Sequence, residues 1–151
     1  MSKIDSLHPL IREEVRRLVD KINNTVLNSN VKMIVTSGLR TFDEQDILFK
    51  QRPKVTNARA GQSIHNYGLA FDFCLVQQGK TIWDVAKDFD TDNIPDWLEV
   101  VTIFKASGYT WGGDFRSFTD KPHFEKTYGY SWQQLFEIKK SSRTENGYVK
   151  I

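Results

Sequence analysis

The sequence predicts a single α+β domain in which a small antiparallel sheet is flanked by helices. Its 151 residues are the usual length of one domain, and the hydrophobic content of 39% with 13% aromatic residues is enough to fill a core. Helical and extended patterns alternate along the chain, and one pair of extended segments is joined by a short turn. We expect the core to cover about residues 8–140.

Amphipathic periodicity and capping signals define the expected helical segments. They lie over residues 9–27, 41–51, 96–107 and 131–140. The first has apolar residues at three-to-four spacing and a proline in its first turn. The second and the last begin with the spacing of a capping box, a serine or threonine followed three positions later by a glutamate or glutamine. The third is preceded by a proline and stopped by a glycine.

Short apolar stretches define the expected strands. They lie over residues 31–36, 68–75, 81–83, 109–111 and 122–125. In the longest of them alternate residues share a face, so Asp72 lies on the same face as Ala70 and Cys74. These small neighbours leave room around the carboxylate. The polar segment 141–151 is expected to be loosely held.

Composition excludes several classes of function. A formal charge of +2 is too small for a dedicated nucleic-acid binder. The only cysteine, Cys74, rules out an internal disulfide and is expected to be a buried, inert thiol rather than a nucleophile. No stretch approaches the ~20 apolar residues of a membrane span, and residues 1–20 lack the apolar core of a signal peptide. We therefore expect no stable membrane association and no classical export signal.

Two of the three histidines lie in short motifs that also contain acidic residues. His65 and Asp72 are seven positions apart across a turn at Gly68, and His123 lies in a second motif, residues 120–125. Two imidazoles and a carboxylate form the ligand set that a catalytic zinc takes when it keeps a fourth position for water. Taken alone, His65 is more often a histidine in a polar turn than a ligand. The third histidine, which precedes Pro9, is expected to be a capping or solvated residue.

Two other segments have open interpretations. Arg40, between a strand and a helix, can present a fork of donors to a carboxylate or an oxyanion, or it can form an ordinary surface salt bridge. The three aspartates at alternate positions in 88–92 suggest a calcium loop. Counting from the first of them, the twelfth residue is Glu99, as an EF-hand requires, but the sixth is Asn93 instead of glycine and Pro95 follows. The calcium interpretation is the weaker one.

Several spaced motifs together resemble a known family. They are Ser-x-His-x-x-Gly-x-Ala-x-Asp at 63–72, Ser-Gly-Leu-Arg-Thr at 37–41 followed by Gln45, Pro-Asp-Trp at 95–97, Trp-Gly-Gly-Asp at 111–114, and Asp-x-Pro-His-Phe-Glu at 120–125. This pattern resembles the LAS-type metallopeptidases, which include lysostaphin, D-alanyl-D-alanine peptidases and the hedgehog N-terminal domain. Within them it is most similar to the L-alanyl-D-glutamate peptidases of phage endolysins and bacterial wall hydrolases. The resemblance covers about residues 37–126.

The resemblance implies a fold of the hedgehog and D-alanyl-D-alanine peptidase type and assigns roles to residues. One zinc ion is expected on His65, Asp72 and His123. The general base is expected at Asp120, where several relatives have a glutamate. Oxyanion stabilisation or a carboxylate clamp is expected from Arg40, and substrate contacts from Ser63, Arg40 and Gln45. Glu125 is expected to orient a ligand.

The function that this resemblance implies is zinc-dependent hydrolysis of the L-alanyl-D-glutamate bond in peptidoglycan stem peptides, with lysis of the bacterial wall. Two alternatives remain: a D-alanyl-D-alanine carboxypeptidase or dipeptidase with the same zinc site, and a non-catalytic relative that only binds metal. We expect residues 1–151 to form one catalytic domain without a wall-binding domain, and the protein to be a monomer. Its expected location is the host cytoplasm before release to the wall, as a phage-encoded or prophage-derived protein.

Overall fold

The computed structural model describes residues 2–27 and 30–151, and its centre is an antiparallel sheet. The strands follow the order β1–β2–β5–β4, and β3 is added to β2. Their bounds are β1 (Val31–Ser37), β2 (Ala70–Gln77), β3 (Lys80–Ile82), β4 (Thr110–Trp111) and β5 (His123–Glu125). The long strand β2 pairs with β1 along one edge, while β3 and β5 share its other edge. The predicted sheet is thus present, with β2 in its middle.

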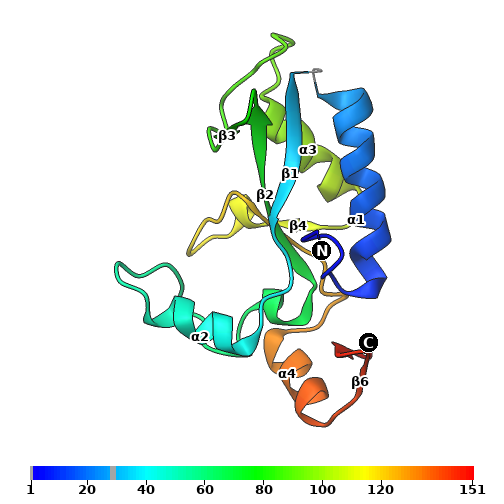
Figure 1. The fold of residues 1–151 in the computed structure, drawn as a ribbon, viewed down its shortest axis with the longest axis vertical. Helices are drawn as coiled ribbons and strands as arrows, with labels where there is room; N and C mark the ends of the chain where they lie inside the picture. Colours follow the sequence, from blue (N-terminus) through cyan, green and yellow to red (C-terminus); the bar gives the residue numbers. More distant parts are fainter. Residues whose placement is uncertain (1, 28–29) are drawn as a thin grey trace.

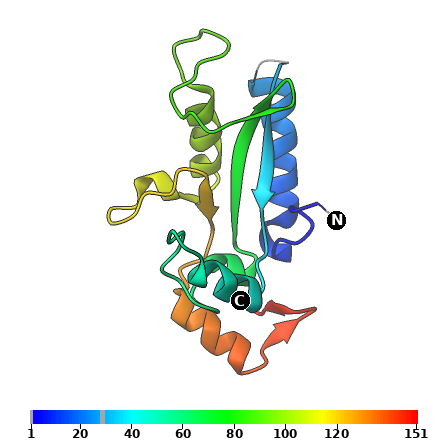
Figure 2. The same ribbon diagram turned by 60° about the vertical axis from the view of Figure 1, so that its left-hand side comes forward.

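Helices flank this sheet, as the sequence predicts. They are α1 (Pro9–Lys21), which continues as a π-helical turn (Ile22–Val26), α2 (Phe42–Lys50), α3 (Asp96–Ala106) and α4 (Trp132–Lys140). The capping boxes expected for α2 and α4 both form, at Thr41 and Ser131. Figures 1 and 2 show α1 and α3 running alongside the long β1–β2 pair, with α2 and α4 together at one end. In the described residues no helix combines the length and the apolar character needed to cross a bilayer.

An aromatic cluster joins the sheet to α3. The ring centroids of Phe71, Phe104 and Phe124 lie 5.0–5.6 Å from one another. Phe73 continues the cluster on β2, and its ring lies 4.3 Å from that of Trp97 at the start of α3. Aromatic pairs at this spacing add to the stabilisation that comes from burying their area. This packing holds the short strand β5 against β2, and so fixes the position of any side chain that β5 carries.

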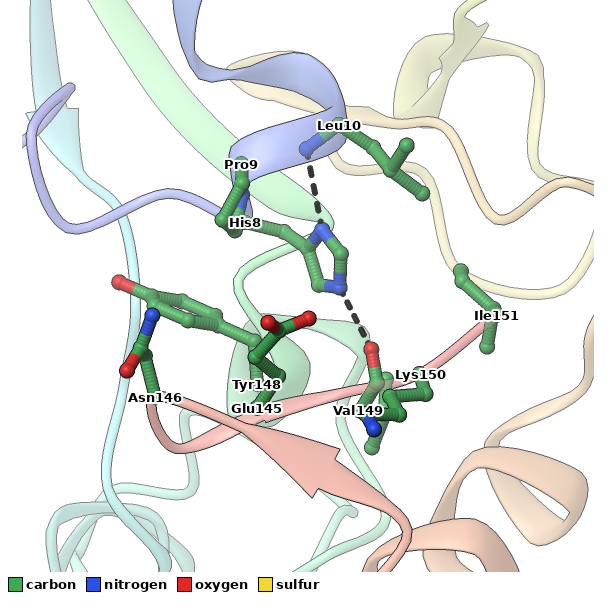
Figure 3. A pocket seen from close by; sticks show the side chains of 9 residues that line it. All are labelled: His8, Pro9, Leu10, Glu145, Asn146, Tyr148, Val149, Lys150 and Ile151. Carbon is green, nitrogen blue, oxygen red and sulfur yellow. Dashed lines mark hydrogen bonds between the residues drawn. The ribbon is translucent and has the colours of Figure 1, made fainter.

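The C-terminal segment is ordered, and the prediction that residues 141–151 are loosely held was wrong. The strands β6 (Thr144–Glu145) and β7 (Tyr148–Val149) form a hairpin, and Val149 is only 2% exposed. Figure 3 shows His8 between this hairpin and the start of α1: its Nε2 donates to the Val149 carbonyl (2.8 Å), and its Nδ1 accepts from the amide of Leu10 (3.1 Å). His8 is therefore the capping residue that was predicted, but it is buried.

Candidate metal centre and active-site cleft

Asp72 lies at the middle of the sheet, and the candidate metal centre forms around its carboxylate. In the register of the strands it is paired with Ser37 on β1 and with His123 on β5. Its Oδ1 lies 3.4 Å from Nε2 of His65 and 3.5 Å from Nδ1 of His123. The three predicted ligands, separated by as many as 58 positions in the chain, are thus brought to one point.

His65 reaches this point from a short 3-10 helix (Ile64–Tyr67) that directly precedes β2. Gly68 ends this helix with φ of 69°, a left-handed conformation that glycine adopts without strain. A side chain at Gly68 would also meet the backbone nitrogen of His8 at 2.8 Å. The glycine therefore allows the chain to reverse between His65 and the strand that carries Asp72.

Each imidazole is oriented by a hydrogen bond at its other nitrogen. Nδ1 of His65 lies 2.9 Å from the carbonyl oxygen of Gly38, and Nε2 of His123 lies 2.8 Å from Oε1 of Glu125. Because a carbonyl or a carboxylate only accepts, these partners place the ring protons on those nitrogens. In the neutral form of each ring the lone pair of the opposite nitrogen then faces Asp72, which is the usual arrangement around a metal-binding histidine. Glu125 thus contacts the histidine that it was expected to orient.

The geometry fits a zinc ion. Asp72 Oδ1 is buried and has no hydrogen-bond partner among the described residues. Two ligand atoms that each lie ~2.1 Å from one tetrahedral zinc are ~3.4 Å apart, close to the 3.4 and 3.5 Å separations seen here. His65, Asp72 and His123 could therefore hold such an ion.

Electrostatics within the centre favour a charged carboxylate. Burial alone would raise the pKa of Asp72, but the two imidazoles beside it hold that pKa well below its usual range. Burial alone would lower the pKa of His123, and the carboxylates of Asp72 and Glu125 instead raise it to about 9. A metal ion that binds here would take the place of the positive charge that His123 otherwise acquires.

The candidate centre opens into a cleft of about 500 Å³. Its lining includes the side chains of Arg40, Ser63 and Asp120. Residues 55–58 also line it, as does Phe118, which has 62% of its surface exposed. All three residues of the candidate centre, His65, Asp72 and His123, are among those that line this cleft.

Asp120 faces the cleft beside the candidate metal centre. Its Oδ2 lies 3.9 Å from Nδ1 of His123, too far for a direct hydrogen bond. Its amide donates to the carbonyl of Gly112 (2.9 Å), and a side chain at Gly112 would overlap the Asp120 backbone. Burial raises the pKa of Asp120, the negative charge of Asp72 adds to this, and the cationic groups nearby oppose it. A raised pKa makes a carboxylate a stronger base, which suits a group that accepts a proton.

Arg40 lines the cleft, but Gln45 does not, and its predicted contact with substrate needs correction. The Gln45 side chain is 0% exposed because its amide bridges two groups inside the protein. Its Oε1 accepts from Nη1 of Arg40 (2.9 Å), and its Nε2 donates to the carbonyl of Ala58 (2.8 Å). Gln45 is therefore a positioning residue that joins Arg40 to Ala58, another residue that lines the cleft.

Ser63 stabilises the turn before β2 and also lines the cleft, and its contact with substrate stays a prediction. Its hydroxyl accepts from the amide of His65 (3.3 Å) and caps the 3-10 helix, and its side chain also lines the cleft. Asn66 was not among the predicted site residues; it donates to the Arg40 carbonyl (2.9 Å) and accepts from the amide of Gly61 (3.1 Å). The polar residue directly after His65 in the motif was the available signal. Asn66 thus links the short helix that carries His65 to the turn that carries Arg40 by a hydrogen bond.

Known proteins share this sequence and this fold. A family model described as D-alanyl-D-alanine carboxypeptidase matches residues 56–126. The chain is 44% identical over 125 residues to the peptidoglycan L-alanyl-D-glutamate endopeptidase CwlK of Bacillus subtilis, covering 79% of this chain and 72% of that protein. The chain belongs to the LAS-type zinc metallopeptidases. A second LAS-type relative, the L-alanyl-D-glutamate peptidase of Listeria phage A118, is 25% identical over 134 residues, which are 86% of this chain and 42% of the phage protein.

A solved structure confirms the predicted fold class. The L-Ala D-Glu endopeptidase ChiX of Serratia marcescens aligns with a TM-score of 0.59 over 83% of this chain and 84% of its own. The sequence identity between the two is 20%, so this likeness concerns the fold. The small antiparallel sheet with flanking helices is thus an arrangement that this LAS-type chain shares with a distant structure.

Proposed function

We propose that this protein is a zinc-dependent peptidoglycan endopeptidase that hydrolyses the L-alanyl-D-glutamate bond of stem peptides. One observation carries the proposal: His65, Asp72 and His123 converge in a cleft that also contains Asp120. The specificity is supported by the names of the two curated relatives, whose similarity extends over most of this chain. The substrate class is therefore peptidoglycan stems, and one zinc ion is the cofactor.

The chain's own residues hold the metal and fix its ligands. Bound zinc would polarise the scissile carbonyl and lower the pKa of a water molecule from 15.7 to ~7. His65 and His123 each offer one nitrogen while the other is held by the Gly38 carbonyl or by Glu125. These outer hydrogen bonds limit rotation of the rings, so the ligand atoms are in place before metal binds.

Asp120 is the proposed general base. It lines the cleft near His123, and burial gives its carboxyl a raised pKa. It accepts a proton from the attacking water and returns it to the amine of the departing D-glutamate, so that the broken C–N bond leaves a neutral amine. A positioned proton carrier of this kind contributes typically ~10²–10⁴-fold to the rate.

Arg40 is the proposed anion-binding residue. Its guanidinium lines the cleft while one of its N–H groups is held by Gln45. A planar guanidinium suits a carboxylate or a developing oxyanion, and a D-glutamate-containing stem supplies both. Ser63, which also lines the cleft, is the second proposed substrate contact.

The alternative activity, a D-alanyl-D-alanine carboxypeptidase, is favoured by the description of the matching family model. It uses the same centre but a different bond. Incubation of the zinc-loaded protein with sacculi of different stem chemistry, followed by mass analysis, separates the two activities. Cleavage at L-alanyl-D-glutamate yields peptides that begin with D-glutamate and leaves L-alanine on the glycan strands, whereas the carboxypeptidase releases D-alanine alone. A chelator abolishes either reaction. A zinc-loaded protein that releases nothing would be the non-catalytic relative.

Replacement of Asp120 tests the mechanism. We expect Asp120→Asn to retain zinc and to lower the rate of sacculus cleavage by ~10²–10⁴-fold, because the proton carrier is lost. The matched control is Asp114→Asn, which removes the same charge from an exposed site near Gly112, where Asp114 pairs with Lys105 (2.7 Å). Equal rates in Asp120→Asn and in the control would remove Asp120 from the mechanism.

We also propose that the protein acts as a monomer and that it is a phage-type lysin that waits in the host cytoplasm. The relative from a Listeria phage supports a phage-type role.

A further inference from the structure

The loop between β3 and α3 gathers carboxylates at a distance from the cleft. Asp88, Asp90 and Asp96 offer carboxylate oxygens within 4.8 Å of one another, and Asp90, Asp92 and Glu99 do the same. None of these residues lines the cleft. Figures 1 and 2 show the loop beyond β3 at the end of the sheet opposite α2 and α4.

Asp96 carries the observation that makes this cluster more than a group of surface acids. Its side chain is 0% exposed, and its Oδ1 accepts from the amide of Phe89 (3.1 Å). Its Oδ2 is buried with no hydrogen-bond partner among the described residues, and the same is true of Asp88 Oδ1 and Glu99 Oε2. A buried carboxylate oxygen without a donor is costly. A cation held by the Asp88, Asp90 and Asp96 group would supply a partner for the first and third of these carboxylates, and Asp90 also belongs to the group that includes Glu99.

The charge of the cluster is not compensated by the protein. In the described residues no salt bridge reaches any of the five carboxylates. Burial, followed by the charges of Asp92, Asp90 and Asp96, raises the pKa of Glu99 to about 7. Burial and neighbouring carboxylates also raise the pKa of Asp96. Like charges in contact raise a carboxyl pKa in this way when no cation is bound.

The order of the acids along the chain matches a calcium loop. Counted from Asp88, they occupy positions one, three, five, nine and twelve, the side-chain positions of an EF-hand. The sixth position, where an EF-hand has glycine, is Asn93, and it adopts φ of 73°. Asparagine tolerates this left-handed conformation better than most residues. Pro95 is the N-cap of α3 and so lies outside the helix. Neither the asparagine at the sixth position nor the proline that follows therefore conflicts with a calcium loop.

We propose that the acidic loop of Asp88, Asp90, Asp92, Asp96 and Glu99 binds one calcium ion. Oxygen-only ligands suit calcium, whereas zinc prefers the imidazoles found at the Asp72 centre. The site lies outside the proposed catalytic machinery.

Calcium in the acidic loop would stabilise the start of α3. Trp97 follows Asp96 in the chain, packs on Phe73, and donates from Nε1 to the carbonyl of Lys121 (3.3 Å). Lys121 adjoins Asp120. Calcium bound in the acidic loop therefore also stabilises the turn that carries Asp120. We expect calcium to raise the thermal stability of the protein.

Titration of the zinc-loaded protein with calcium chloride tests the proposal. We expect calorimetry to give one ion per chain with a Kd of ~10⁻⁵–10⁻³ M, the range between EF-hand sensors and extracellular calcium modules. The Tm rises with calcium, and magnesium at the same concentration gives a smaller rise because it holds its water and requires octahedral geometry. No heat and no Tm change with calcium up to about 10 mM, above the weakest such sites, would overturn the proposal.

Charge-neutralising variants show where the ion binds. Asp96→Asn and Glu99→Gln are expected to weaken calcium binding by about tenfold or more, because affinity depends on the number of charged ligands. In the absence of calcium both variants have a Tm at least equal to that of the unaltered protein, because repulsion is relieved; this distinguishes lost binding from misfolding. Asp20→Asn, on the exposed side of α1, is the matched control and keeps the full calcium response. An equal response in all three variants would refute the assignment.

Discussion

The Asp72 centre and the acidic loop both gather three ligand atoms within 4.8 Å, yet they differ in chemistry. The centre combines one carboxylate with two imidazoles, and each imidazole is held at its outer nitrogen. The loop offers carboxylates alone. Because nitrogen ligands favour zinc and oxygen ligands favour calcium, one small protein can keep two ions apart by ligand type.

The two sites also differ in how the chain brings their ligands together. The Asp72 centre needs the register of β2 against β5 and the turn before β2. The acidic loop needs only twelve consecutive residues, Asp88–Glu99. The Asp72 centre therefore depends on the whole fold. The acidic loop is largely local, and its last ligands are positioned by the first turn of α3.

The largest expected effect comes from breaking one site while the other stays intact. His65→Ala removes a ligand of the Asp72 centre and is expected to reduce zinc content and to lower sacculus cleavage by more than ~10³-fold, since the metal supplies the activated water. Its Tm still rises with calcium. Metal analysis and thermal unfolding with and without calcium measure both responses. If the calcium response disappears as well, calcium binds at the Asp72 centre and the two sites are one.

A smaller effect is expected when only the support of a ligand is removed. Glu125→Ala leaves His123 in place but deletes the acceptor for its Nε2 proton. Loss of such an outer partner typically costs ~10–100-fold in metal affinity or activity. Zinc titration against a competing chelator gives the affinity. Glu145→Ala, on the exposed strand β6, is the control and should behave as the unaltered protein does. Unchanged zinc affinity in Glu125→Ala would mean that the sheet alone orients His123.

The smallest effect concerns His8, whose two nitrogens both bind backbone groups. Burial lowers the pKa of His8 below 6.5, the nearby charge of Arg12 adds to this, and the bond to Val149 opposes it. The unfolded chain therefore takes up the proton at higher pH, so the stability that neutral His8 contributes is present above pH 6.5 and is lost as the pH falls. Thermal unfolding at several pH values should show a steeper acid loss than in His8→Asn, which keeps a capping side chain. Identical profiles would contradict this role.

Local signals in the sequence predicted most of the helices and strands. The capping boxes at Thr41 and Ser131 and the alternation along β2 act over a few residues, so they could be read directly. The C-terminal hairpin could not, because its order depends on His8, which lies 141 positions earlier than Val149. Its polar composition gives no sign of that contact.

The sequence predicted the residues of the candidate site but not the hydrogen bonds that connect them. The motifs identified His65, Asp72 and His123, and the structure brings them together. The role of Gln45 was not predictable, because a glutamine near an arginine reads equally well as a substrate contact or as an internal support. Only the burial of its amide decides between them. The conformation of Asn93 was hidden for a similar reason, since backbone dihedrals of asparagine vary with context.

The carbonyl of Lys121 accepts from two indoles, that of Trp111 on β4 (2.7 Å) and that of Trp97 on α3 (3.3 Å). The turn that it belongs to is closed by a bond from the His123 amide to the Asp120 carbonyl (3.1 Å). The proposed proton carrier and a candidate metal ligand thus belong to one turn, which side chains from β4 and α3 both support. A displacement of that turn would shift both groups together.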